Sequence, residues 1–176
     1  IFEKYDNKLE SNYSKCINNL RFINILNFGE SSCYRAIKLA KEQRDFNNLL
    51  NLYYYSSIYL LNNNDKDLLK RTYYKSRELA FEALKVSRKN EFKHTEDPII
   101  QHLYDIIAFT YSEFKDYENA LLYYQKSIEF ALENNTKSDE IKYNSHLNMA
   151  YIYMQNSDYS NALDTHIKIL NNKRCK

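Results

Sequence analysis

The sequence predicts an all-α protein, built as a stack of antiparallel helical hairpins with about eight helices. Its 176 residues include one Gly and one Pro, too few for the tight turns of a β-sheet protein. Apolar residues recur at helical spacing between short polar breaks. The pattern of one hairpin returns 42 residues later, and repetition at a fixed period indicates a stacked architecture.

The first half of the chain contains apolar stripes separated by polar or helix-stopping residues. Gly29 follows the first stripe, where a helix end favours glycine. The third stripe is apolar nearly all round, so its helix is expected in the middle of the molecule. The predicted helices of this half cover residues 1–27, 31–44, 48–61 and 66–90.

The clearest hairpin spans residues 98–135. Asp97 is expected to cap its first helix, and Pro98 suits the first helical position because its missing N–H needs no partner there. Ala108 and Ala120 stand where the two helices would touch, which lets them approach closely. The apolar faces of the two helices are Leu103, Tyr104, Ile107, Ala108 and Tyr111, and then Tyr117, Ala120, Leu121, Tyr124, Ser127, Ile128 and Ala131.

Two more helices are expected after the polar break at 136–140. The first begins near Ile141 and ends at the break at 156–158, and the second covers 159–172. No linker divides the chain, so one domain is predicted over its whole length. Its expected parts are an N-terminal hairpin at 1–45, a degenerate repeat at 46–91, and repeats at 97–136 and 139–175.

The internal repeat is explicit in two motifs. Ala-Phe-Thr-Tyr at 108–111 matches Ala-Tyr-Ile-Tyr at 150–153, and Asp-Tyr-Glu-Asn-Ala-Leu at 116–121 matches Asp-Tyr-Ser-Asn-Ala-Leu at 158–163. Each such hairpin has more apolar surface than its own helices cover, so neighbouring hairpins must stack to bury the remainder.

These residue types resemble the tetratricopeptide repeat. The clearest hairpin offers the pattern at Tyr104, Ile107, Ala108, Tyr111, Tyr117, Ala120, Tyr124 and Ser127. The period of 42 exceeds the usual 34 and is similar to the lengthened repeats of kinesin light chains and of peptide-sensing bacterial regulators. The loop Gly and closing Pro of the family are absent. The resemblance implies a right-handed superhelix, with first helices lining a concave face and second helices outside.

The charge balance argues against a partner that is recognised mainly through its charge. Twenty-five basic and 23 acidic side chains give a formal net charge of +2, so attraction to nucleic acid or anionic membranes is not expected. No apolar run has the length of a membrane span. A protein or peptide partner is the expectation that remains.

Catalysis, cofactors and metals are not expected either. The four histidines have no i, i+3 or i, i+4 spacing between them, and no phosphate-binding Gly-rich loop occurs. The three cysteines are odd in number and form no Cys-x-x-Cys. A disulfide framework is therefore not predicted, and a reducing, cytoplasmic location fits.

The predicted site is the groove lined by the first helices of the hairpins. Asn148 precedes Met149-Ala150, where repeats of the resembled family that hold extended peptides often carry an Asn. Its amide can bond both the N–H and the C=O of a peptide backbone. The alternative is that Asn is common here through an A+T-rich codon bias. The predicted peptide-binding residues are Asn148, Phe109, Tyr151, His102, Asp105, Glu113, Asn144, Gln155 and Tyr55.

The functional hypothesis is a non-catalytic scaffold that binds a peptide or partner segment in its concave groove. One alternative is the sensing domain of a signal-peptide-responsive transcriptional regulator. Another is an assembly subunit, because the C-terminal helix has no polar capping helix and its apolar side is free to pair in a homo- or hetero-oligomer.

Overall fold

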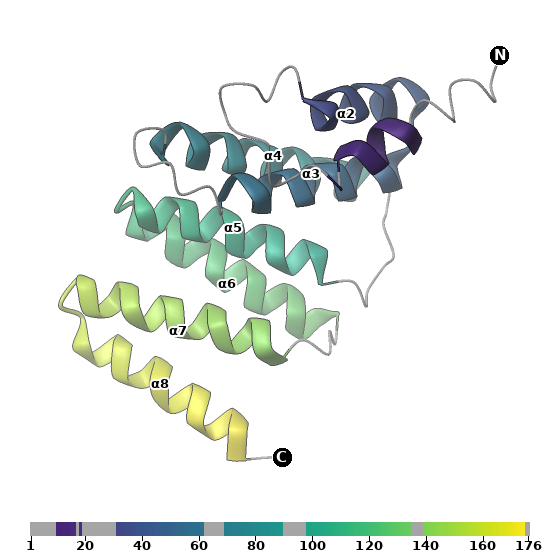
Figure 1. The fold of residues 1–176 in the computed structure, drawn as a ribbon. Coiled ribbons are helices and arrows are strands. Elements are labelled where there is room, and N and C mark those ends of the chain that lie inside the picture. The colour runs from purple at the N-terminus through teal and green to yellow at the C-terminus, as the bar shows by residue number, and fades with distance from the viewer. Residues whose placement is uncertain are drawn as a thin grey trace. The chain divides into compact units, whose positions relative to one another are not determined.

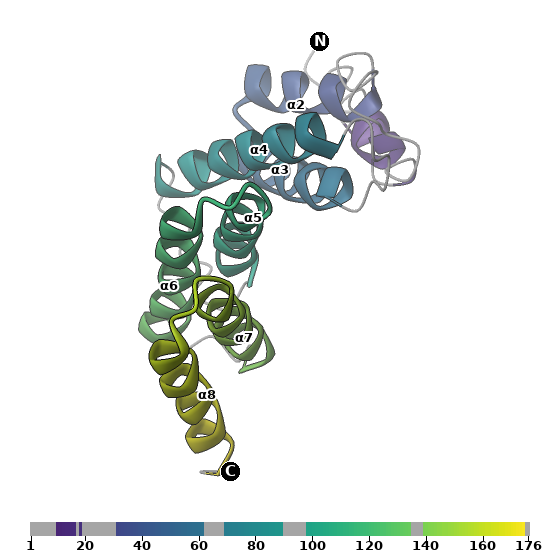
Figure 2. The same ribbon diagram turned by 90° about the vertical axis from the view of Figure 1, so that its left-hand side faces the viewer.

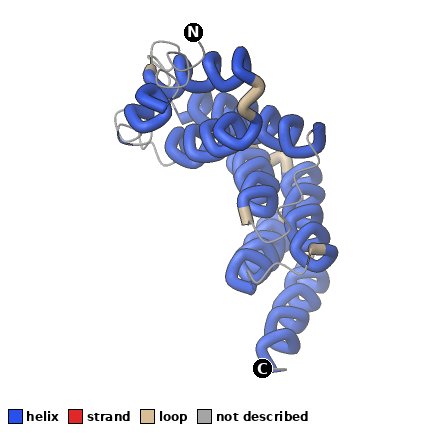
Figure 3. Tube along the Cα trace, turned by 90° about the vertical axis from the view of Figure 1, so that its right-hand side faces the viewer, coloured by secondary structure: helices blue, strands red, loops and turns tan. Residues whose placement is uncertain are grey.

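The computed structural model describes residues 10–16, 18, 31–61, 69–89, 98–134 and 139–174. Those residues form helices joined by turns, and no strand occurs among them (Figure 3). Besides the helical segment at 10–16, the helices are α2 Ser32–Gln43, α3 Phe46–Leu61, α4 Leu69–Lys89, α5 Ile99–Glu113, α6 Tyr117–Glu133, α7 Asp139–Gln155 and α8 Tyr159–Arg174 (Figure 1). The predicted all-α class is confirmed.

The chain forms two compact units, residues 1–92 and 93–176. Each is described by itself below, and the single-domain assignment and the superhelical winding stay predictions. Most of the predicted first helix, Gly29 and the cap Asp97 lie outside the described residues. Helix α5 begins at Ile99, so Pro98 takes the N-cap position, one residue before the position predicted for it.

In the first unit, α3 packs against both α2 and α4. Its buried side chains come from several sides of the helix, as its nearly all-round apolar sequence predicts: Leu49, Leu50, Leu52, Tyr53, Tyr54, Ser56, Ser57 and Leu60. The Ser76 hydroxyl of α4 donates a hydrogen bond of 2.8 Å to the Ser57 carbonyl of α3. Helix α3 is thus the central helix of this unit.

In the second unit, two hairpins stack on each other (Figure 2). Helix α5 pairs with α6 and α7 pairs with α8, while α7 also packs against α6 and α5. Ala108 and Ala120 are fully buried, which confirms their predicted packing role. The core cluster of this unit is Ala108, Ala120, Tyr124, Ile128, Met149 and Ile152.

Three hairpin turns share one backbone geometry: α2–α3, α5–α6 and α7–α8. In each, a non-glycine residue with φ near 60° precedes an aspartate: Arg44, Lys115 and Ser157. The amide of the aspartate then donates to the carbonyl five residues earlier, at 3.0, 3.0 and 2.8 Å respectively. A left-handed residue after the last helical turn satisfies carbonyls that the helix leaves open. The break predicted at 45–48 is therefore a hairpin turn of the same type as the two in the repeats.

The aspartates of these turns cap the helices that follow. The carboxylates of Asp45, Asp116 and Asp158 accept hydrogen bonds from the backbone N–H three residues later, at 3.1, 3.3 and 3.2 Å. The residue that donates is an asparagine each time, and its side-chain amide bonds the same carboxylate. This Asp-x-x-Asn arrangement satisfies an N–H that a helix start leaves without a partner.

Replacing Asp116 with alanine should lower the free energy of unfolding by about 1 kcal/mol, because the N–H of Asn119 loses its cap. Urea denaturation followed by circular dichroism measures this loss. Glu118→Ala is the matched control, since Glu118 is exposed in the same helical turn. Equal losses in both variants would contradict a specific capping role.

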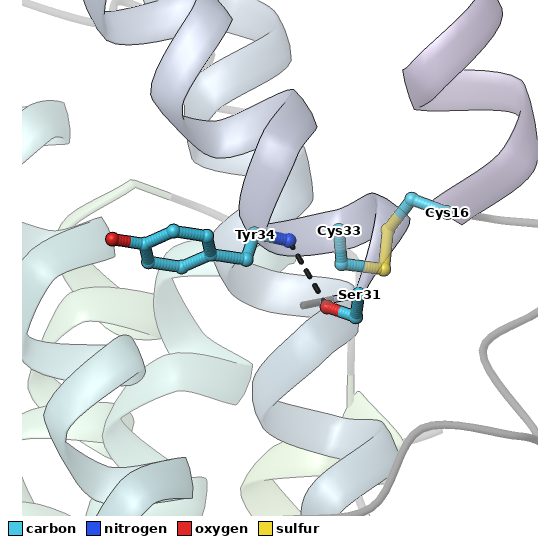
Figure 4. Close-up of a disulfide and its surroundings, with 4 residues drawn as sticks. All are labelled: Cys16, Ser31, Cys33 and Tyr34. Carbon is cyan, nitrogen blue, oxygen red and sulfur yellow. Dashed lines mark hydrogen bonds between the residues drawn. A yellow bond between two sulfur atoms is a disulfide. The ribbon is translucent and has the colours of Figure 1, made fainter. Parts of the chain in front are cut away.

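The expectation of cysteines without a disulfide framework needs a correction, because one disulfide is present. Cys16 and Cys33 are bonded, with Cα atoms 4.5 Å apart and both side chains buried (Figure 4). Cys33 lies in the first turn of α2, next to the N-cap Ser31, whose hydroxyl accepts a hydrogen bond from the Tyr34 N–H. An odd cysteine count excludes full pairing but allows one pair. That pair depends on how α2 meets the segment at 10–16, which spacing in the sequence does not reveal.

Candidate binding face on helices α5 and α7

Helices α5 and α7 are the first helices of their hairpins, and they contact each other within the second unit. We define the α5–α7 face by the predicted site residues that lie on one side of each helix. On α5 these are His102, Phe109 and Glu113, and on α7 they are Asn144, Asn148, Tyr151 and Gln155. All are exposed except His102, which is half-buried.

The two helices present matching side chains. Three positions of α5 correspond, 42 residues on, to positions of α7: His102 to Asn144, Phe109 to Tyr151, and Glu113 to Gln155. The aromatic pair leaves much of its surface in solvent, with Phe109 37% and Tyr151 58% exposed. The face therefore offers a polar group, an aromatic ring and another polar group on each helix.

Asp105 lies beneath this face rather than on it. The Ser145 hydroxyl of α7 donates a 2.7 Å hydrogen bond to its Oδ1. The Ser127 hydroxyl of α6 lies 3.4 Å from that of Ser145 and donates to the Gln101 carbonyl at 3.3 Å. This polar network joins α5, α6 and α7. Burial raises the pKa of the Asp105 carboxyl to about 7, although the hydrogen bond from Ser145 acts in the opposite direction.

Asn148 is exposed but not isolated. Its side chain is hydrogen-bonded to the hydroxyl of Tyr124, a residue of α6 that is buried in the core cluster. Burial, and then the nearby charge of Asp105, raise the pKa of that hydroxyl. An asparagine amide has two N–H donors and a carbonyl, so one bond to Tyr124 fixes the amide and leaves further capacity for a ligand.

Four aromatic side chains of α5 and α6 pack against each other in pairs. Tyr111 stacks on Tyr123 at a centroid distance of 5.7 Å, and Tyr104 lies 6.3 Å from Phe130. The Lys126 ammonium lies 4.6 Å from the centre of the Tyr123 ring. Because all of these side chains are half-buried, Phe109 is the large aromatic that α5 exposes.

Tyr55 belongs to the first unit and is 40% exposed on α3. Its ring lies 5.1 Å from that of Tyr54. Burial raises the pKa of Tyr13, and the nearby hydroxyl of Tyr55 raises it further. It is not part of the α5–α7 face, and its predicted role stays a prediction.

Spacing in the sequence does not indicate the hydrogen-bond network between the two helices. Asp105 and Ser145 are 40 residues apart and Ser127 and Ser145 are 18 apart, and neither separation matches the period of 42.

In the part of the chain that the structure describes, no three His, Cys, Asp or Glu side chains gather as metal ligands. No helix within those residues is long and apolar enough to cross a membrane.

No protein-family model and no curated protein sequence matches this chain. Among solved structures it is similar to BtubC (BKLC) from P. vanneervenii, with a TM-score of 0.52 and 16% sequence identity, over 99% of this chain and 72% of that one. The chain has a tetratricopeptide-like helical-repeat fold. At this identity the likeness shows the fold alone. A MamA RS-1 double mutant aligns over 97% of this chain and 96% of that chain with 15% identity, but its TM-score of 0.39 supports no inference.

Proposed function

We propose that this tetratricopeptide-like chain is a non-catalytic scaffold that holds an extended segment of a partner protein on the α5–α7 face. Folds of this type generally mediate protein interactions. The observation that carries the proposal is the exposure of Phe109 and Tyr151 at equivalent positions of two adjoining helices. Aromatic side chains bury a large area with little loss of conformational freedom, so they serve well as anchors.

Recognition of the segment would combine two kinds of contact. Phe109 and Tyr151 would pack against apolar side chains of the segment, and the Asn148 amide would bond its backbone. With His102 neutral, Glu113 is the one charged residue among those that define the face. The proposal therefore favours a segment with apolar side chains over a strongly charged one.

The network below the face supports this function by keeping the two helices in register. The Asp105–Ser145 hydrogen bond links α5 to α7, and the Tyr124 hydroxyl holds Asn148. A face positioned before binding loses less entropy when the ligand arrives. Asp105 itself would act on the peptide indirectly, through this positioning.

The disulfide between Cys16 and Cys33 bears on the compartment in which the protein meets its partner. The cytoplasmic prediction rested on unpaired cysteines, and the disulfide between Cys16 and Cys33 removes that basis. Disulfides persist mainly in oxidising compartments. We therefore propose a partner met in an oxidising environment.

The test is a triple variant, Phe109→Ala, Asn148→Ala and Tyr151→Ala. Pull-down from the native organism, with mass-spectrometric quantification, should show at least a tenfold loss of the proteins that the wild type captures. Helicity should be unchanged, and the free energy of unfolding should fall by about 2 kcal/mol, because the Tyr124 hydroxyl loses a partner and the covered part of the Phe109 ring loses packing.

The control for this experiment is Leu122→Ala with Leu132→Ala, two exposed side chains on α6 away from the face. This variant should capture the same proteins as the wild type. Undiminished capture by the triple variant would overturn the proposed binding face.

A further inference from the structure

The Asp105 carboxyl lies where three helices of the second unit meet, and the proposed function gives its charge no role. The residue is half-buried, and its Oδ1 accepts the 2.7 Å hydrogen bond from the Ser145 hydroxyl of α7. Within the residues that the structure describes, no basic side chain forms an ion pair with this carboxyl. A carboxylate that loses water without gaining a cation is unfavourable relative to the neutral acid. This position therefore favours the protonated form.

Helix α7 is attached to its neighbours at two points close to each other. Ser145 bonds to Asp105 of α5, and the side chain of Asn148 bonds to the Tyr124 hydroxyl of α6. Residues three apart lie on adjacent turns of one side of a helix. The two bonds therefore set the position of Asn148, and of Tyr151 three residues farther along α7.

Tyr124 is the ionisable side chain of α6 that interacts with Asp105. Burial raises the pKa of its hydroxyl, and the charge of Asp105 raises that pKa further. From α7 the Ser145 hydroxyl reaches the carboxyl, and the next residue, His146, is half-buried. On α5, Glu113 is exposed and acts on Tyr124 more weakly than Asp105 does. An ionised Asp105 thus places negative charge beside both attachments of α7.

We propose that Asp105 is a positioning residue of the α5–α7 face, which binds its partner segment tightly while this carboxyl is protonated and more weakly once it ionises. Ionisation costs less where water reaches the carboxylate, so it favours arrangements in which α7 has separated from α5 at Ser145. These arrangements move Asn148 and Tyr151 relative to Phe109, and a segment that contacts all three then loses part of its site. The inference rests on the proposed function, because it concerns the regulation of the same face.

The pH range follows from the burial of the group. Burial raises the pKa of Asp105 from 3.8 to about 7 while the face is intact, whereas a carboxyl that water reaches keeps its ordinary value. Between these values the intact face holds a proton that the separated arrangement has released. The affinity should therefore fall as pH rises from about 4 to about 7, and stay level above that.

Amide hydrogen exchange of the full chain, measured by mass spectrometry at about pH 5 and about pH 8, tests the positioning step without a ligand. After correction for intrinsic rates, the amides of α7 should exchange roughly threefold faster or more at the higher pH, and those of α6 should change less. Asp105→Asn keeps an acceptor for Ser145 and cannot ionise, so its α7 should show no such change. Ser145→Ala removes the attachment without a change of charge, and its α7 should exchange faster than that of the wild type at the lower pH.

The binding step is tested by pull-down at the same two pH values. The probe is the protein that the wild type captures and the triple variant of the α5–α7 face does not. The wild type should capture about threefold more of it at the lower pH, Asp105→Asn should capture equal amounts at both, and His146→Gln should keep the pH dependence of the wild type.

Three results would overturn the inference. The first is exchange of α7 that does not change with pH in the wild type. The second is equal acceleration of α6 and α7, which would indicate a general loss of stability of the unit. The third is a pH dependence of exchange or capture that persists in Asp105→Asn, which would assign it to another group, such as His102. The proposed function fails separately, if no captured protein depends on the α5–α7 face at either pH.

Discussion

Replacing Asp105 with asparagine should stabilise the protein at pH 8 and change its stability little at pH 4. Asparagine has the shape of the protonated carboxyl, keeps an acceptor for the Ser145 hydroxyl, and cannot ionise. The wild-type carboxyl of Asp105, in contrast, must ionise where it is buried beside serine hydroxyls. Ionisation there loses hydration that the hydroxyls replace only in part.

The sign follows from the direction of the pKa shift. Burial raises the pKa of Asp105 from 3.8 to about 7 in the folded chain. Between these values the folded state holds a proton that the unfolded state has released. The free energy of unfolding of the wild type therefore falls as pH rises from about 4 to about 7, and this contribution is constant above that. Three pH units correspond to about 4 kcal/mol at most.

Urea denaturation of wild type and Asp105→Asn at half-unit steps from pH 4 to pH 8 measures this difference. The gap between the two proteins should open between about pH 4 and about pH 7 and stay level from there to pH 8. Glu113→Gln, which removes an exposed carboxylate from the same helix, is the control for the loss of a carboxylate as such. A gap that is constant with pH would show that Asp105 does not ionise in the range predicted.

Removal of the Cys16–Cys33 disulfide should cost the first unit about 3 kcal/mol. The bond joins residues 17 apart in the sequence, and closing a loop of this size removes about that much free energy from the unfolded chain. Cys33→Ser should therefore lower the melting temperature, as should reduction of the wild type by dithiothreitol. Cys16 and Cys33 both belong to the first unit, so the loss should appear in the transition of that unit.

The variant supplies its own control, since dithiothreitol should have no further effect on Cys33→Ser. If reduction leaves the melting of the wild type unchanged, the disulfide does not stabilise the fold. Mass spectrometry before and after alkylation reports whether the bond is present in the purified protein.

Local features of this fold could be predicted because they depend on neighbouring residues. The helical spacing of apolar side chains located α2 to α8 to within a few residues, and Ala108 and Ala120 are buried at the contact expected for them. The recurrence of Asp-Tyr-x-Asn at 116–119 and 158–161 showed the repeat. The left-handed residues of the turns were not anticipated, because Arg44, Lys115 and Ser157 are not types that favour positive φ.

Features that join distant segments could not be predicted in the same way. The pairing of Cys16 with Cys33 and of Asp105 with Ser145 each requires a particular meeting of two segments. Asp105 was predicted to face a peptide from its position on α5. A shift of about one-sixth of a helical turn from the exposed stripe puts its carboxyl between helices, which sequence spacing alone does not resolve.

We propose that the α5–α7 face holds the partner. Site-specific photo-crosslinking tests it directly, with benzoylphenylalanine placed singly at Phe109, Tyr151 or Leu122 of the full chain. One captured protein should crosslink from the first two positions and not from Leu122, an exposed side chain on α6. Crosslinking from Leu122 as strong as from the other two positions, or from neither Phe109 nor Tyr151, would show that the partner does not bind the α5–α7 face.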